Sequence, residues 1–153
     1  MKNLLISACL LGFECKYSGG SNALDGEKLA ALKESFRLIP VCPEFAGGLP
    51  TPRPPSERRD GKVINKLGQD VTEEYRKGAE TALYLARRYG CACALLKERS
   101  PSCGSGEIYD GSFTGTLVPG DGTAAQALKA HGLRVYGEGE LEQVLSLSKA
   151  EEQ

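Results

Sequence analysis

Four short apolar runs, separated from one another by segments with helical spacing, constrain the fold of this chain more than any other feature. The runs cover residues 3–8, 37–41, 91–96 and 133–136, and each is too short to be a buried helix. Helices are expected over residues 25–35, from Asp70 to Gly90, from Asp121 or Thr123 to Ala130, and over 138–149. Strands that alternate with helices form a mostly parallel sheet flanked by helices. The sequence therefore predicts a single α/β domain of Rossmann-like architecture.

Capping residues and prolines set the expected boundaries of these elements. Asp25 is expected to cap the first helix, and Asp70 with Glu73 three residues later resembles a capping box. Gly90 stands where the long helix should end. Residues 47–56, GGLPTPRPPS, hold four of the eight prolines, so they predict an ordered loop or an extended arm.

Length and charge argue against several classes of protein for this chain. The 153 residues suit one domain, expected to span 1–153 with a C-terminal tail over 148–153. The net charge is −1, from 19 Lys and Arg against 20 Asp and Glu, which does not favour nucleic-acid binding. No apolar run approaches the roughly 20 residues of a membrane span, so a soluble cytoplasmic protein is expected. The chain lacks G-x-G-x-x-G and Walker patterns, so a dinucleotide-binding site is not expected.

Cysteine is frequent for a cytoplasmic protein, whereas histidine is nearly absent. Six cysteines occupy positions 9, 15, 42, 91, 93 and 103, and His131 is the only histidine. Without an export signal, these cysteines indicate metal ligation, a reactive thiol or small buried residues rather than disulfides. A single histidine nearly excludes Ser-His-Asp catalysis and zinc sites that need several histidines.

Three of the cysteines follow predicted strands at their carboxyl ends. Cys9 and Cys42 come directly after the first two strands, and Cys103 lies seven residues beyond the third. In open parallel sheets these ends form the ligand crevice, so the three thiols could converge there and bind a soft metal or an iron–sulfur cluster. Three unrelated loop cysteines are the alternative. Cys91 and Cys93 lie in an apolar run and are expected to be buried core residues.

Four sequence blocks carry a resemblance to a known family. The blocks are SACLLGFECKYSGG, VCPEFAGGLPTPRPPSE, LLKERSPSCGSGEIYDGSFTG and VPGDGTAAQALKAHGLRVY. With their C-L-L-G, C-P-E and S-P-S-C-G motifs, they resemble the thiouracil desulfidase (TudS-like) family of small bacterial proteins. The resemblance covers about residues 3–145, which is nearly the whole chain.

The resemblance implies an iron–sulfur enzyme that converts 2-thiouracil and water to uracil and hydrogen sulfide without net redox change. In the family a [4Fe-4S] cluster is held by three cysteines, and the fourth iron takes the sulfur of the substrate. By motif position those ligands are Cys9, Cys42 and Cys103. The implied partners are a small thiolated base and the machinery that assembles clusters.

Polar residues beside these cysteines are the candidate catalytic and substrate-binding groups. The resemblance implies that Glu44 activates water or supplies a proton, and that Ser100 is the second catalytic residue. Ser102 is the rival hydroxyl and a candidate for substrate contact. Three loop residues are further candidates for substrate contact: Lys16, Tyr17 and Arg53.

Three other functions remain open from the sequence. The same thiols would suit a metal-binding or cluster-binding module without catalysis, or a zinc protein with three cysteine ligands and water. A thiol-based transferase that uses Cys103 as its nucleophile would lack a histidine base, although Lys97 or a helix dipole could lower the pKa of that thiol. Turnover of 2-thiouracil and metal analysis discriminate among these functions.

Overall fold

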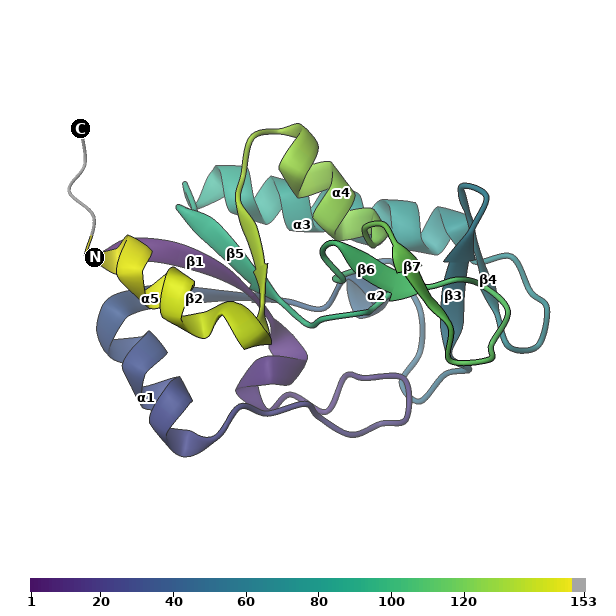
Figure 1. The fold of residues 1–153 in the computed structure, drawn as a ribbon, viewed down its shortest axis with the longest axis horizontal. Coiled ribbons are helices and arrows are strands. Elements are labelled where there is room, and N and C mark those ends of the chain that lie inside the picture. Colours follow the sequence, from purple (N-terminus) through teal and green to yellow (C-terminus); the bar gives the residue numbers. More distant parts are fainter. Residues whose placement is uncertain (150–153) are drawn as a thin grey trace.

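A four-stranded parallel sheet forms the centre of the molecule, and this confirms the predicted α/β fold. The computed structural model describes residues 1–149. The sheet contains β1 (Lys2–Ser7), β2 (Phe36–Val41), β5 (Cys93–Leu96) and β8 (Val135–Gly137). These strands pair in the order β2-β1-β5-β8, and every pair is parallel (Figure 1).

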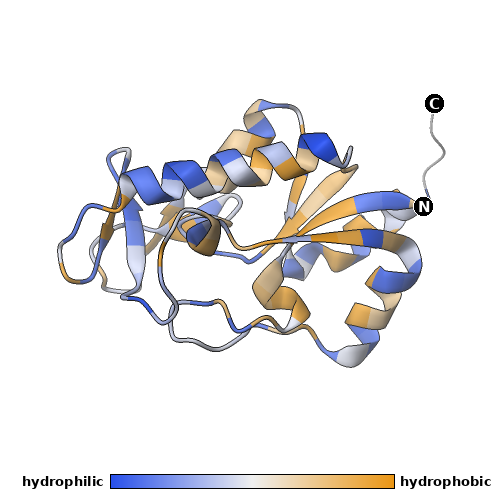
Figure 2. Ribbon diagram, turned by 180° about the vertical axis from the view of Figure 1, so that it is seen from behind, coloured by the Kyte–Doolittle hydropathy of each residue, from blue (hydrophilic) through white to orange (hydrophobic). Residues whose placement is uncertain are grey.

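Helices cover both faces of the sheet, which gives the molecule three layers. They are α1 (Gly26–Ser35) and α5 (Leu141–Ser148) on one face, and α3 (Thr72–Arg88) and α4 (Thr123–Ala130) on the other (Figure 1). Successive residues of β1 point to opposite faces, so Leu4 packs in one buried cluster with Leu32 while Leu5 packs in another with Ala82. Figure 2 shows apolar strands at the centre and polar residues along the outer side of α3. Among residues 1–149, no helix combines the length and the apolar character that crossing a membrane requires.

The strand order places a crevice at the carboxyl ends of β1 and β5. The chain passes from β1 to β2 on one side and then crosses to β5 on the other side of β1. Open α/β sheets bind ligands where neighbouring connections diverge in this way. Cys9 follows β1 within a short 3₁₀ helix (Ala8–Leu11), and Cys42 follows β2 directly. Cys103 belongs to the loop after β5, so all three cysteines follow neighbouring strands.

Two antiparallel hairpins and one short helix lie outside the elements expected from the sequence. They are β3 (Ser56–Arg59) with β4 (Lys62–Asn65), β6 (Glu107–Tyr109) with β7 (Leu117–Pro119), and α2 (Pro43–Ala46). The hairpin strands have only three or four residues and little apolar alternation, so they carry no recognisable strand pattern. Both hairpins lie beyond the carboxyl end of the sheet, away from the N-terminus (Figure 1).

The helix caps are partly as expected. Asp25 caps α1, because its carboxylate accepts the N–H of Lys28 at 3.0 Å. The capping box expected at Asp70 is wrong, because Asp70 still pairs with Ile64 in a β-bridge and Val71 becomes the N-cap of α3. The backbone at Asp70 is therefore held by the hairpin, and the helix begins two residues later than the sequence pattern suggests.

The third strand and the last helix also begin later than expected. The N–H of Cys91 donates to the carbonyl of Ala86 at 2.9 Å, so the end of α3 holds Cys91 outside the strand and β5 starts at Cys93. Cys93 is completely buried, as expected. Residues 138–140 form a 3₁₀ helix that precedes α5. Of the tail expected over 148–153, Ser148 belongs to α5, and residues 150–153 lie outside the described part of the chain.

A close approach between α2 and α3 fixes the backbone next to Cys42. A Cβ atom on Gly78 of α3 would lie 2.0 Å from the carbonyl oxygen of Pro43. Inside a helix, replacing glycine by alanine normally stabilises by about 1 kcal/mol. At Gly78 we expect the opposite sign: Gly78→Ala should lower the free energy of unfolding by about 1–3 kcal/mol, the usual cost of overpacking.

Urea denaturation of the wild type and of Gly78→Ala measures this difference in the free energy of unfolding. Gly26→Ala is the matched control, because a Cβ atom on Gly26 at the start of α1 would meet nothing within 4 Å. We expect that control to be as stable as the wild type or slightly more stable. A Gly78→Ala protein of unchanged stability would contradict the close helix contact.

Candidate active site

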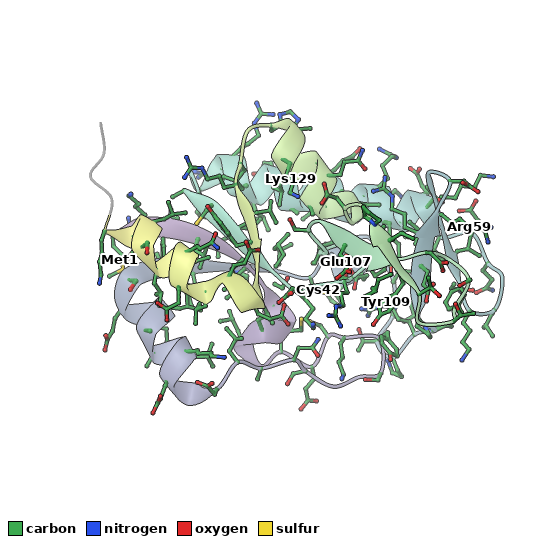
Figure 3. The ribbon with its side chains drawn as sticks, in the orientation of Figure 1. Met1, Cys42, Arg59, Glu107, Tyr109 and Lys129 are labelled. Atoms are coloured by element: carbon green, nitrogen blue, oxygen red, sulfur yellow. The ribbon has the colours of Figure 1, made fainter. Side chains whose placement is uncertain are left out.

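One cavity brings the three strand-end cysteines together. It has a volume of about 570 Å³ and lies among the loops after β1, β2 and β5 and the two hairpins. Cys9, Cys42 and Cys103 all line it, together with Glu44 and Ser100. In Figure 3, Cys42 lies near the middle of the molecule, between the sheet and the β6–β7 hairpin. The structure therefore places these five candidate residues around a common space.

Neighbouring polar side chains form hydrogen bonds to two of these thiols. Ser7, at the end of β1, donates its hydroxyl proton to Cys103 Sγ at 3.3 Å, and the side chain of Asn22 bonds to Cys9. Burial raises the pKa of both Cys9 and Cys103 above the usual thiol value, and the nearby Glu44 carboxylate adds to this rise. Both thiols are therefore protonated at neutral pH in the free chain, and a cationic metal centre would favour their thiolate forms.

A fourth thiol lies on the wall of the same cavity. Cys15 belongs to the loop after the first 3₁₀ helix, and its carbonyl oxygen accepts the S–H of Cys42 at 3.7 Å. Burial, followed by the nearby thiols of Cys42 and Cys9, raises the pKa of Cys15 to about 12. Cys91 and Cys93 are not among the cavity residues, because they lie at the opposite end of the sheet, at the start of β5.

The donor set suits a soft metal group of several atoms. Thiolates are the usual ligands of iron–sulfur clusters. Cys9, Cys42 and Cys103 come from three separate loops, and the cavity that they line, about 570 Å³, has room for such a group. Within residues 1–149, no three His, Cys, Asp or Glu side chains are placed to hold one metal ion.

Glu44 is held at both of its carboxylate oxygens. Its Oε2 forms an ion pair with Arg53 Nη2 at 3.1 Å, and its Oε1 accepts a hydrogen bond from Ser102 Oγ. The side chains of Arg53 and Glu44 are only 4% and 15% exposed, so salt and water screen this pair much less than an ion pair on the surface. The carboxylate thus has a fixed orientation at the edge of the cavity.

The guanidinium group of Arg53 forms hydrogen bonds to several protein groups. The sequence predicts substrate contact for this residue, but its guanidinium donates to the carbonyl oxygens of Pro50 at 3.2 Å and Cys15 at 2.9 Å, and to Thr51 Oγ1 at 3.0 Å. Together with the Glu44 ion pair, these bonds occupy both terminal nitrogens. The proline-rich loop therefore supplies a buried arginine that joins the Cys15 loop to the Glu44 carboxylate.

A tight turn before Cys103 directs Ser100 to the cavity and Ser102 to the interior. Ser100 Oγ accepts the N–H groups of Ser102 and Cys103, both at 3.1 Å. The turn packs against the start of α4, where a Cβ atom on Gly122 would lie 2.5 Å from the backbone of Ser102. Ser102 is completely buried and does not line the cavity, so the structure gives no support to its expected contact with substrate.

Comparison with known proteins identifies the family of the chain. The family model for 2-thiouracil desulfurase matches residues 4–140, which include every cavity residue named above. The chain belongs to the 2-thiouracil desulfurase family. The solved structure of a [4Fe-4S]-dependent thiouracil desulfidase, TudS, has a TM-score of 0.92 and 46% sequence identity, over 98% of this chain and 100% of that one. The uncharacterized protein YbbK of Bacillus subtilis (strain 168) is 41% identical over 152 residues, or 93% of this chain and 99% of YbbK.

The other substrate-contact candidates of this desulfurase-family chain have different surroundings. Lys16 and Tyr17 both line the cavity, and Tyr17 is half exposed. Lys97 also lines the cavity, but its ammonium group pairs with Glu138 at 2.8 Å. Lys16 and Tyr17 therefore remain candidates that line the cavity, whereas the ion pair of Lys97 holds its side chain against the segment after β8.

Several residues that line the cavity are not singled out by the sequence patterns. They include Ser7, Asn22, Glu57, Tyr75, Tyr109 and Phe113. Ser7 and Asn22 flank the Cys9 segment and had a usable signal, because polar residues at strand ends in this fold face the ligand crevice. The hairpin residues Glu57 and Tyr109 have no such signal in the sequence, because strands of three or four residues without apolar alternation cannot be recognised from the sequence.

Proposed function

We propose that this protein is a [4Fe-4S]-dependent thiouracil desulfidase, which converts 2-thiouracil and water to uracil and hydrogen sulfide. The observation that carries the proposal is the convergence of three thiols, from the loops after three neighbouring strands, on a cavity that Glu44 also lines. The 46% identity to a desulfidase that depends on a [4Fe-4S] cluster supports it. The reaction replaces C=S by C=O, and both hydrogens of water leave with sulfur, so it needs no oxidant or reductant.

Cys9, Cys42 and Cys103 are the proposed ligands of the cluster. A cluster bound through three thiolates supplies one iron without a protein ligand, which is a Lewis acid with affinity for the soft sulfur of a thiocarbonyl. Ser7 orients Cys103 by a hydrogen bond, and Asn22 does the same for Cys9. Cellular cluster-assembly machinery is the proposed source of the iron and sulfide.

The remaining cavity residues bind the base and move protons. Glu44 presents a fixed carboxylate that takes up a proton of the attacking water, and Ser100, which lines the same cavity, is the second proposed catalytic group. Tyr109 and Phe113, from the β6–β7 hairpin, supply aromatic surface to the cavity, on which a planar ring can stack. Lys16 and Tyr17 are the proposed polar contacts of the substrate.

Turnover by anaerobically reconstituted protein tests the function. Incubation with 2-thiouracil should release uracil and hydrogen sulfide in equal amounts without any added reductant. Removal of the metal with a chelator should abolish turnover, and the loss should be restored by renewed reconstitution. Iron, sulfide and zinc contents, measured on the same samples, show which metal accompanies activity.

Two outcomes would contradict the proposal. Protein that retains a full cluster but releases no sulfide from 2-thiouracil would instead be a non-catalytic cluster-binding module. Activity that follows the zinc content rather than the iron content would instead indicate a zinc site with three cysteine ligands.

A further inference from the structure

Two hydroxyl groups and one carboxylate beside the thiols form a continuous hydrogen-bonded chain. Ser100 Oγ lies 3.0 Å from Ser102 Oγ, and Ser102 Oγ donates to Glu44 Oε1. Ser100 and Glu44 both line the cavity, whereas Ser102 is completely buried. The chain therefore connects two points on the cavity wall through the protein interior.

The proton count of each group fixes the direction of this chain. A serine hydroxyl has one proton and two lone pairs. Both lone pairs of Ser100 Oγ are taken by the N–H groups of Ser102 and Cys103, at 3.1 Å each, so Ser100 is the donor in its bond with Ser102. Ser102 in turn donates to Glu44, whose carboxylate has no proton to give. The contact from Ser102 Oγ to Cys103 Sγ is longer, 3.5 Å, and sulfur is the weaker acceptor.

Arg53 keeps the far end of the chain in place. Its Nη2 occupies Glu44 Oε2 at 3.1 Å, which leaves Oε1 to Ser102. Because Arg53 also donates to the carbonyl oxygens of Pro50 and Cys15, it cannot follow the carboxylate if that group rotates. The same oxygen of Glu44 therefore stays opposite Ser102.

We propose that Ser102 is a positioning residue that passes a proton from Ser100 to Glu44 during hydrolysis, an inference that rests on the proposed desulfidase function. When water adds to the thiocarbonyl carbon, a C–O bond forms and the π electrons of C=S move to sulfur. The Ser102 proton passes to Glu44 Oε1 and the Ser100 proton passes to Ser102, and the O–H electron pair that this leaves on Ser100 Oγ takes up the water proton. The N–H groups of Ser102 and Cys103 stabilise negative charge that develops on Ser100 Oγ.

The second half of the reaction restores the chain. The C–S bond breaks with its electron pair on sulfur, and the C=O bond of uracil forms. The proton held by Glu44 and the remaining proton of the attacking water leave with sulfur as hydrogen sulfide. No electron is gained or lost by the protein.

Removal of the Ser102 hydroxyl tests the proposal. Ser102→Ala interrupts the chain without altering the cavity wall, and Ser102→Thr keeps a hydroxyl at that position. We expect turnover per bound cluster to fall about 10²-fold in Ser102→Ala and to recover largely in Ser102→Thr. The affinity for 2-thiouracil, read from a visible spectral titration, should not change. Ser105→Ala removes a hydroxyl of the same loop that bonds elsewhere, to Val135, and should behave as the wild type.

Two further measurements separate a relay from a structural role. Groups that act in series give losses that do not add, so Ser100→Ala/Ser102→Ala should be about as slow as Ser100→Ala alone. Single-turnover rates of the wild type in mixtures of H₂O and D₂O should show a curved dependence on the deuterium fraction, because more than one proton moves.

Each opposite result overturns the relay. Additive losses, a linear isotope dependence or wild-type turnover in Ser102→Ala would mean that Glu44 takes the proton directly from water. The isotope measurement needs only the wild type, so the proposal can be judged even if Ser102→Ala loads no cluster. Wild-type protein that carries the cluster but releases no sulfide would refute the desulfidase function itself, which is a different failure.

Discussion

Serine in place of Cys9, Cys42 or Cys103 should give a folded protein that does not retain an iron–sulfur cluster. Each residue is proposed to supply one of only three protein ligands, and a serine oxygen is a harder and poorer partner for cluster iron than a thiolate. We therefore expect each variant to lose the visible absorption, the bound iron and sulfide, and all turnover of 2-thiouracil. Iron and sulfide analysis after anaerobic reconstitution measures the loss, and thermal unfolding of the metal-free variants shows that they fold.

Two other cysteines provide matched controls. Cys15 lines the same cavity but is not a proposed ligand, so Cys15→Ser should keep the cluster. Cys93 is completely buried at the other end of the sheet, so Cys93→Ser should keep the cluster and lose about 1–3 kcal/mol of stability, because its hydroxyl would be buried without a partner. Cluster loss in Cys15→Ser together with retention in Cys9→Ser would show that the ligand set is wrong.

The central fold was predictable because its signals are local. Each strand of the main sheet contains a short apolar run, and α3 shows a helical apolar pattern that includes Tyr75, Ala79 and Ala82. The hairpins were not predictable, because residues such as Glu57 and Arg58 alternate with no apolar partner on their own strand. Their position depends on contacts with distant segments, such as the bond from Arg58 to the carbonyl of Asp121.

The site was predictable only in part, for a similar reason. The thiols of Cys9, Cys42 and Cys103 could be expected to converge, because strand order alone brings the carboxyl ends of neighbouring parallel strands together. The surroundings of Glu44 could not be expected from the strand order. Its partner Arg53 belongs to a loop without a regular pattern, and both roles depend on tertiary contacts between loops. The position of Arg53 in this loop therefore predicts a substrate contact, whereas its ion pair with Glu44 becomes visible only in the structure.

Glutamine in place of Glu44 should separate catalysis from cluster binding. The amide has almost the same shape as the carboxylate, and its oxygen can still accept the hydrogen bond from Arg53. Its NH₂ group then faces Ser102 Oγ and donates to it, which reverses the direction of the bond that Ser102 makes to Glu44 in the wild type. The hydrogen-bonded chain would end at a group that cannot take a proton.

We therefore expect Glu44→Gln to bind the cluster with wild-type iron content and colour, and to turn over 2-thiouracil about 10²–10⁴-fold more slowly, the usual loss for a missing general acid or base. Addition of 2-thiouracil should still change the visible spectrum, but hydrogen sulfide should not accumulate at the wild-type rate. Ser100→Ala should show the same pattern more mildly, because the Ser100 hydroxyl only passes a proton on, whereas Glu44 is the group that holds it. Wild-type turnover in Glu44→Gln would move the proton-accepting role to another residue. Loss of the cluster in that variant would make Glu44 a ligand, and the three-thiolate site would then be wrong.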